Sequence, residues 1–346
     1  MSNAFKVPVP TNEPIKDYAP NSEEKKSLVA KIDELSSMKV EIPIIIDGKE
    51  IETGDIGDCV KPYDHAHILG TFHKAGEQQV KMAIESSLDA WSDWSQTSFE
   101  FRAKIFLKMA KLLSGPYRDI INASTMLNMS KNAYQAEIDA ACELIDFWNF
   151  NCYYAEEIYR QQPMYSPKGT KNQTEHRPLE GFVFAVTPFN FTSIAANLPS
   201  APALMGNTAI WKPASSTVYP AYFMMNLFKE AGLPDGVINL LPGSGAVVGN
   251  QILSHPKLAG IHFTGSTGVF QSMWKHVGEN IKNYDSYPRI VGETGGKDFC
   301  VAHESCNKEA LATAMTRGAF EFQGQKCSAM SRAYICLLYT SPSPRD

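Results

Sequence analysis

The stretch GFVFAVTPFNFT, residues 181–192, begins with an almost continuous apolar run, Phe182 to Thr187. Four more short runs of this kind follow along the chain: TAIWK (208–212), VINLL (237–241), GIHFT (260–264) and RIVGE (289–293). Segments with helical spacing of apolar residues lie between them, such as Pro220 to Ala231 and Gly268 to Ile281. Apolar strands that alternate with helices are typical of a parallel sheet covered on both faces. The sequence therefore predicts an α/β fold whose ligands bind at the carboxyl ends of the strands.

The part of the chain before this stretch predicts mostly helices. Apolar residues recur at helical spacing in residues 76–94, 102–113 and 134–159. Residues 42–51, IPIIIDGKEI, predict a hairpin because Asp-Gly is a strong signal for a tight turn. The proline-rich and then charged residues 1–41 predict an arm that lies on a larger body. The polar segment 160–181 predicts an exposed strand between the helical part and the sheet.

Charge and composition exclude several classes of binding partner for this chain and indicate its location. The chain has 346 residues, a net charge of −5 and no basic stripe, so nucleic acid is not an expected partner. No run of about 18 apolar residues is present, so no membrane span is expected. The seven cysteines are an odd number without a C-x-x-C pair, which favours a reducing compartment and no metal site. Because residues 1–20 carry neither an apolar nor an arginine-rich leader, the expected location is the cytoplasm, with the mitochondrial matrix as the alternative.

Two glycine-rich segments are candidates for a phosphate site. FTGSTG follows an apolar strand and places Gly265 and Gly268 where a helix begins, so main-chain N–H groups there could face a phosphate. PGSGAVVG, residues 242–249, has a looser glycine spacing. Either segment can also be an ordinary turn. Lys212 ends a strand just before Pro213, where its ammonium can reach a ligand over the sheet edge or can simply be solvated.

A cysteine and a glutamate form the candidate catalytic pair. Cys327 lies in GQKCSA, and Glu293 lies at a strand end in VGETGGK. An ordinary thiol has a pKa near 8.5, so a nucleophilic cysteine needs a base or a positive environment. A nearby carboxylate can serve as that base and can activate water against a thioester. Asn190, between two phenylalanines, can donate to an oxyanion or can be a simple turn residue.

These motifs together resemble a known family. TPFNFT, Trp-Lys-Pro at 211–213, FTGSTG, GETGGK and GQKCSA occur in the order and approximate spacing of the aldehyde dehydrogenase superfamily. The resemblance covers residues 42–335 almost completely. Within the superfamily, AEIDAACELIDFWNFN (136–151) is similar to the branch that oxidises pyrroline-5-carboxylate, as glutamate semialdehyde, to glutamate in proline breakdown.

The resemblance implies a role for each matched residue. Cys327 is the nucleophile, Glu293 the base, and Asn190 with the main-chain N–H of Cys327 the oxyanion site. NAD is the implied cofactor, contacted by Thr187, Lys212, Gly265, Ser266, Thr267, Gly268 and Val269. Glu143 and Ser328 are implied neighbours of a small aldehyde substrate, although Glu143 can equally lie on a solvated helix face.

The resemblance also implies the domain organisation. Residues 1–41 form the arm, 42–300 the Rossmann-type NAD-binding domain, with 160–181 as an oligomerisation strand, and 301–335 the start of a second α/β catalytic domain. The expected full-length protein is a homo-oligomer. Residues 336–346, CLLYTSPSPRD, look foreign to the family, and the chain ends 19 residues after Cys327. We therefore expect a chain truncated within its catalytic domain.

Alternatives remain open at this level. The family's NAD-preferring members often carry an acid at the position of Ser215, and serine there does not exclude NADP. A different semialdehyde dehydrogenase of the superfamily would share all five motifs. A non-catalytic NAD-binding fragment is the alternative from another class.

Overall fold

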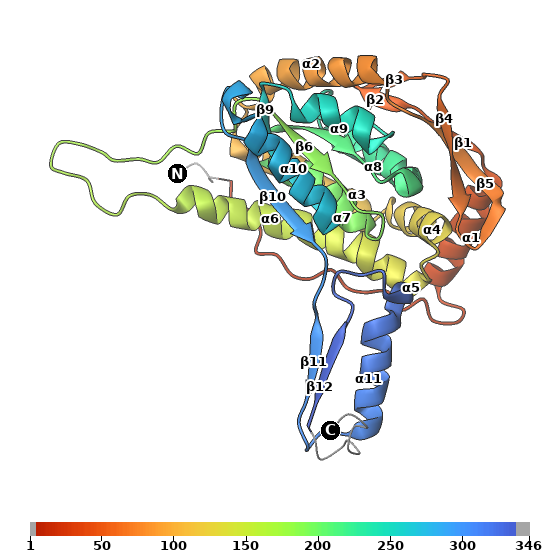
Figure 1. Ribbon diagram of the computed structural model, residues 1–346. Coiled ribbons are helices and arrows are strands. Elements are labelled where there is room, and N and C mark those ends of the chain that lie inside the picture. Colours follow the sequence, from red (N-terminus) through yellow and green to blue (C-terminus); the bar gives the residue numbers. More distant parts are fainter. Residues whose placement is uncertain (1–4, 337–346) are drawn as a thin grey trace.

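The main sheet has seven strands and is parallel in its centre. The computed structural model describes residues 5–336 (Figure 1). The strand order is β10-β9-β6-β7-β8-β2-β3. The five parallel strands confirm the apolar runs predicted from the sequence: β6 (Phe182–Val186), β7 (Thr208–Lys212), β8 (Ile238–Leu240), β9 (Leu258–Gly265) and β10 (Arg289–Thr294).

The connection of these strands creates a binding crevice. From β6 the chain proceeds to β7 and β8 on one side, and it then crosses back to place β9 and β10 on the other side of β6. The order therefore reverses between β6 and β9. At such a switch point the loops after the two strands diverge and leave a crevice at their carboxyl ends.

The predicted hairpin is present and extends the sheet. β2 (Ile44–Ile46) pairs antiparallel with β3 (Lys49–Ile51) and with β8. The turn residues Asp47 and Gly48 have φ values of 54° and 66°, which suit an Asp-Gly turn of the type that joins tight hairpins.

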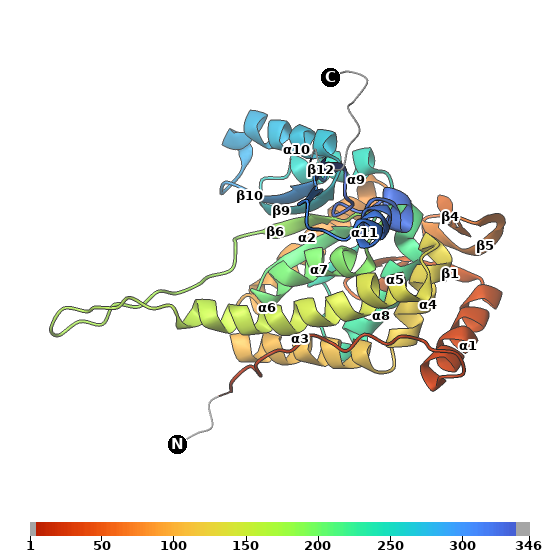
Figure 2. The ribbon, with the colours of Figure 1, turned by 90° about the horizontal axis from the view of Figure 1, so that it is seen from below.

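Helices cover both faces of the sheet (Figures 1 and 2). One face packs against α2 (Glu77–Trp94), α9 (Gly245–Leu253) and α10 (Thr267–Glu279). The other face packs against α3 (Phe99–Ser114), α6 (Glu143–Arg160), α7 (Thr192–Leu204) and α8 (Val218–Ala231). Adjacent residues of β7 serve opposite cores: Ile210 lies in the first and Trp211 in the second, as the alternation of a strand requires.

The N-terminal arm is part of a third core. α1 (Glu23–Ser37) buries Leu28 and Leu35, and it packs beside α4 (Arg118–Met129). A small sheet of order β1-β5-β4 covers this region, formed by β1 (Val40–Ile42), β4 (Ile56–Lys61) and β5 (Asp64–His73). The sequence did not predict this sheet. Residues 5–20 lie along α6, where Asp146 accepts hydrogen bonds from Asn12 and Glu13 (Figure 2).

The predicted helix over 134–159 contains an irregular segment. It consists of α5 (Ala133–Ala136), a π-helical turn (Glu137–Cys142) and α6. Ile138, an apolar residue of this segment, is half-buried. Because the π turn changes the helical phase, Glu137 and Asp139 are buried there.

The segment after α6 leaves the body of the molecule. Residues 161–180 form a long projecting loop with no strand in the described chain (Figure 1). The strand expected over 160–181 is therefore not formed within a single chain. Its use in an assembly stays a prediction.

The last of the described residues form a small unit that projects from the sheet domain (Figure 1). β11 (Phe299–Ala302) pairs parallel with β12 (Arg332–Ile335), and α11 (Lys308–Phe320) joins them. This is the beginning of the second α/β unit expected from the sequence. Short 3₁₀ turns lie at Ser215–Thr217, Ile281–Asn283 and Glu321–Gly324. Of the tail expected at 336–346, residues 337–346 lie outside the described residues.

Candidate active site

Two neighbouring cavities occupy the crevice at the switch point. They have volumes of about 540 and 630 Å³. The loop after β6 and the end of β9 form their shared wall, because both cavities are lined by Pro188, Phe189, Thr264 and Gly265. A ligand that spans both cavities would cross this shared wall.

The first cavity has the features of a nucleotide site. Lys212 and Thr187, from the ends of β7 and β6, line it, and burial lowers the pKa of the Lys212 ammonium. The Lys212 ammonium donates to the Pro213 carbonyl at 3.0 Å, and Thr187 Oγ1 accepts from the Trp211 indole at 2.9 Å. The cavity thus holds a buried cation and a fixed hydroxyl at the strand ends.

Both glycine segments contribute to this first cavity. Gly245 and Gly249 of PGSGAVVG line it together with Gly265 of FTGSTG and Val269, the residue that follows this motif. A Cβ on Gly249 would meet no atom within 4 Å, so the glycine leaves open space beside the cavity. The looser of the two candidate segments, which sequence alone could not separate from a turn, is therefore part of the same site.

The start of α10 faces the crevice. Ser266 is its N-cap, and the Ser266 hydroxyl accepts from the Val269 N–H at 3.4 Å. Ser266 lines the second cavity and Val269 the first, while Thr267 and Gly268 are exposed and line neither. The remaining free N–H groups of this first turn can attract an anion.

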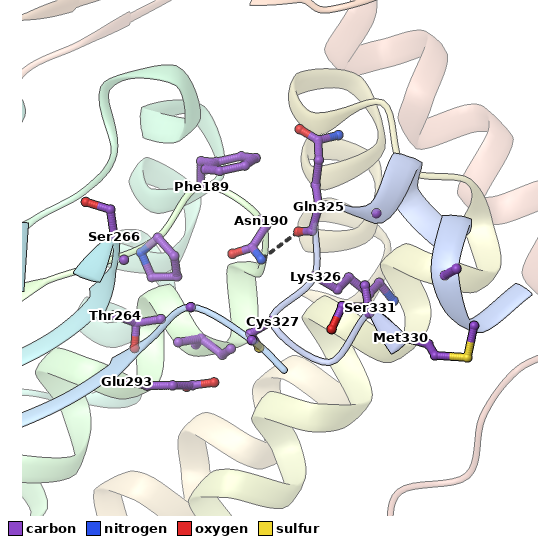
Figure 3. Close-up of a pocket in the computed structure, with 18 residues that line it drawn as sticks. Phe189, Asn190, Thr264, Ser266, Glu293, Gln325, Lys326, Cys327, Met330 and Ser331 are labelled. Carbon is purple, nitrogen blue, oxygen red and sulfur yellow. Dashed lines mark hydrogen bonds between the residues drawn. The ribbon is translucent and has the colours of Figure 1, made fainter. Parts of the chain in front are cut away.

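The second cavity brings Cys327 and Glu293 together (Figure 3). Glu293 comes from the end of β10, and Cys327 lies between η4 (Glu321–Gly324) and β12. Burial, followed by the adjacent Glu293 carboxylate, raises the pKa of the Cys327 thiol to about 11, and the main-chain N–H groups of Ser328 and Cys327 oppose this. The thiol is therefore protonated at neutral pH and lies against a base that can accept its proton.

Asn190 lines the same cavity but has a partner already. Its side-chain amide donates to the Gln325 carbonyl at 2.8 Å (Figure 3). An amide carries two N–H bonds, so one donor remains for a ligand. The contact also joins the loop after β6 to the segment that carries Cys327.

Glu143 and Ser328 do not line this cavity. Glu143 starts α6 and accepts a hydrogen bond from Ser193, and burial raises the pKa of its carboxyl group. The reading of Glu143 as a solvated helix face was wrong, because the side chain is half-buried. Its expected contact with substrate stays a prediction.

Sequence reasoning missed a group of charged side chains at the cavity, one of which, Lys326, lines it. Lys131, Asp139 and Lys326 form ion pairs there, and both Lys131 and Asp139 are buried. The helical spacing of apolar residues in the sequence did not predict an ion pair in this region. The sequence offered one clue, the position of Lys326 next to Cys327.

One group of metal-ligating side chains comes together within residues 5–336: Glu41, Glu52 and His73. Nδ1 of His73 accepts hydrogen bonds from the Thr53 and Gly54 N–H groups, at 3.1 and 3.2 Å. Nε2 of His73 therefore carries the proton that faces Glu41 at 3.0 Å. Both ring nitrogens of His73 thus have hydrogen-bond partners within the described residues.

A comparison with models of protein families shows to which family the chain belongs. The model of the aldehyde dehydrogenase family matches residues 50–336. The chain belongs to the aldehyde dehydrogenase family. The resemblance stated from the five motifs is confirmed.

Individual relatives of this aldehyde dehydrogenase chain share one name. A Schizosaccharomyces pombe protein named probable delta-1-pyrroline-5-carboxylate dehydrogenase is 48% identical over 334 residues, which are 96% of this chain and 61% of the relative. The human mitochondrial delta-1-pyrroline-5-carboxylate dehydrogenase is 42% identical over 94% of this chain and 57% of its own length. That location agrees with the alternative expected from the sequence, and the cytoplasmic location stays a prediction.

A solved structure supports the same relationship for this aldehyde dehydrogenase chain. The delta-pyrroline-5-carboxylate dehydrogenase of Mycobacterium tuberculosis, bound with NAD, is 53% identical and superposes with a TM-score of 0.94. The alignment covers 97% of this chain and 63% of that one. The chain thus spans about three fifths of the length of its relatives. Within residues 5–336, no helix has the length and apolar character that crossing a membrane requires.

Proposed function

We propose that this chain is the cofactor-binding and nucleophile-bearing part of an enzyme that oxidises L-glutamate γ-semialdehyde to glutamate with NAD, in proline catabolism. The observation that carries the proposal is the contact of Cys327 with Glu293 in a cavity that adjoins the switch-point crevice. The names of the relatives and the NAD in the Mycobacterium tuberculosis structure support the substrate and the cofactor.

The residues that line the first cavity suit the binding of a dinucleotide. The cavity offers a buried ammonium at Lys212, glycine-lined walls and the positive end of a 13-residue helix, α10. Lys212 and Thr187 would hold a ribose and the residues Gly265, Ser266, Thr267, Gly268 and Val269 the pyrophosphate. The Ser215 hydroxyl donates to the Gly243 carbonyl at 3.3 Å. Because serine is uncharged, it would not repel the 2′-phosphate of NADP. NADP is therefore a second candidate, to be measured beside NAD.

The proposed reaction assigns one task to each side chain. Glu293 accepts the thiol proton, and the Cys327 sulfur adds to the aldehyde carbonyl carbon to give a hemithioacetal. Asn190 and the Cys327 N–H donate to the resulting oxyanion. NAD, when bound, supplies the hydride acceptor. Once this first proton has passed to solvent, Glu293 removes a proton from water, which attacks the thioester carbon; the C–S bond breaks, and the carboxylic acid and the Cys327 thiolate are released.

The substrate pocket and the assembly are further parts of the proposal. We also propose that Glu143 and Ser328 lie beside the aldehyde and that the projecting segment 161–180 lies in the interface of a homo-oligomer. The loop buries few of its residues within one chain, so it is available to a second copy. Light scattering of the full-length protein with and without residues 164–176 tests this interface.

The direct test is NADH formation by the full-length protein. Glutamate semialdehyde should be oxidised faster than succinate semialdehyde and other aldehydes of similar size. Faster oxidation of another aldehyde would favour a different semialdehyde dehydrogenase. NAD binding without oxidation of any aldehyde by the full-length protein would favour a non-catalytic nucleotide-binding protein. An acylating enzyme is disfavoured because Glu293 is suited to activate water against the thioester.

A further inference from the structure

A buried carboxylate holds two ammonium groups behind the nucleophile. Asp139 lies in the π-helical turn and accepts from Lys131 at 2.5 Å and from Lys326 at 2.9 Å. The side chains of Lys131 and Asp139 are 0% and 3% exposed, and that of Lys326 is 11% exposed. We call these three residues the Lys131–Asp139–Lys326 cluster. Because charged side chains are rarely buried to this degree, their mutual pairing is what makes the arrangement stable.

The cluster reaches the nucleophile through one peptide bond. Lys326 immediately precedes Cys327, so fixing the Lys326 ammonium limits where the Cys327 thiol can lie. The carbonyl of Gln325, on the other side of Lys326, accepts from Asn190. The proposed nucleophile and the proposed oxyanion donor are therefore tied to the same short segment.

The same cluster holds a strained turn that leads into this segment. Phe322 and Gln323 have φ values of 51° and 55°, in the left-handed region that non-glycine residues rarely adopt. Such a conformation persists only when its surroundings hold it in place. The Lys131 ammonium lies 4.6 Å from the centre of the Phe322 ring, and Phe322 is buried.

The aromatic ring beside Asn190 completes the arrangement. The Phe191 ring centre lies 4.3 Å from the Lys131 ammonium and 5.4 Å from that of Lys326. Cations at these distances from a ring are attracted to its face. The cluster thus contacts both the loop after β6 and the segment that carries Cys327.

We propose that Asp139 is a positioning residue, which holds the turn 322–323 and the segment 325–327 so that the Cys327 thiol stays against Glu293. The proposal rests on the proposed function only in treating Cys327 as the reactive thiol. Other charged groups around the cluster are Glu321, 3.4 Å from Lys326, and the half-buried Glu143. Glu321 is more exposed and belongs to the turn itself, so it cannot anchor that turn to the body.

The test measures Cys327 alkylation against pH by site-resolved mass spectrometry, on the full-length protein without NAD or aldehyde. Asp139→Asn keeps the side-chain shape and removes the charge. We expect its alkylation midpoint to fall by about one pH unit or more, toward that of an ordinary thiol, because the thiol moves away from Glu293. Aldehyde oxidation should slow at the same time.

Two further variants separate positioning from folding. Asp146→Asn removes an acid of α6, the helix that follows the π-helical turn, whose carboxylate accepts from Asn12 and Glu13 of the N-terminal arm, and it should leave the midpoint unchanged. Lys326→Met removes the ion pair between Lys326 and Asp139 but leaves the buried Lys131–Asp139 pair. It should therefore lower the alkylation midpoint, and it provides a test even if Asp139→Asn does not fold. Wild-type midpoints in the folded Asp139→Asn and Lys326→Met proteins would overturn the proposal. Since alkylation needs neither substrate nor cofactor, this result is independent of the proposed reaction.

Discussion

Gly296 and Cys327 are in direct backbone contact. A Cβ placed on Gly296 would lie 2.2 Å from the carbonyl oxygen of Cys327, a distance at which the backbone must shift. The glycine after β10 is therefore required by the close approach of the nucleophile and not by chain flexibility. This contact fixes the distance between the strand end that carries Glu293 and the segment that carries Cys327.

Gly296→Ala should consequently disturb the site more than the fold. We expect a loss of about 1–3 kcal/mol in the free energy of unfolding, from forced backbone movement, and a strong loss of aldehyde oxidation. Gly278→Ala is the matched control, because a Cβ there would meet nothing within 4 Å on helix α10. It should be neutral or slightly stabilising. Equal effects of the two changes on activity would contradict the role of the Gly296 contact.

Cys327→Ala should abolish turnover and leave cofactor binding intact. Without the sulfur no hemithioacetal can form, so NADH formation in the full-length protein should fall roughly 10⁴-fold or more. Calorimetric titration should give an unchanged affinity for NAD. Cys300→Ala, a half-exposed cysteine of β11, is the control and should retain turnover. Robust turnover of the Cys327 variant would sink the covalent mechanism.

Glu293→Gln should change the titration of the thiol. Burial and, after it, the adjacent Glu293 carboxylate raise the pKa of Cys327 to about 11, so removing the carboxylate's negative charge should favour the thiolate. The pH at which alkylation of Cys327 is half-maximal should therefore fall by roughly one unit. A midpoint that rises or stays constant would show that Glu293 does not act on the thiol in solution.

The same variant should also separate the two halves of the reaction. If Glu293 activates water, its loss leaves the thioester on Cys327 to be hydrolysed slowly. Rapid mixing should then give a burst close to one NADH for each site, followed by slow turnover. A uniform slow rate without a burst would show instead that removal of the thiol proton by Glu293, and not the activation of water, limits the reaction.

Lys212→Met should weaken NAD binding. Lys212 is the buried cation of the first cavity, and loss of a charged hydrogen bond should raise the dissociation constant about 10-fold or more. Lys257→Met removes a lysine that pairs with Asp285 on the surface and should have no such effect. Calorimetric titration of both variants with NAD and NADP measures the loss and the cofactor preference together.

The sheet was predictable from the sequence because its central strands are buried on both faces. Residues 182–186 and 209–211 are apolar without interruption, which separates these runs from the helices around them. β5 was not predictable in the same way, because the first half of DHAHILGTFH is polar and exposed. α7 was missed for another reason: Pro199 and Pro202 lie inside it, and proline within a run usually predicts the end of a helix.

The sequence could predict those site residues whose side-chain chemistry and motif indicate a role. Cys327, Glu293 and Asn190 lie in one cavity, as their motifs indicated. Asp139 was not found, because an acid on a helix is normally solvated and only the π turn directs it inward. Contacts that depend on the exact phase of a helix are not encoded in local spacing.

The π turn makes the length of one helix critical. A regular α-helix turns by about 100° per residue. Deleting one residue between 137 and 142 would convert the π-helical turn into a regular α-helical one. The part of the helix before the deletion would then be rotated by about 100° relative to α6. Asp139 could then no longer face both lysines. By contrast, residues can be removed from the projecting loop 161–180 without changing the phase of any helix. Two neighbouring parts of the chain should thus differ sharply in their tolerance of single-residue deletions, which a deletion scan scored by Cys327 alkylation would reveal.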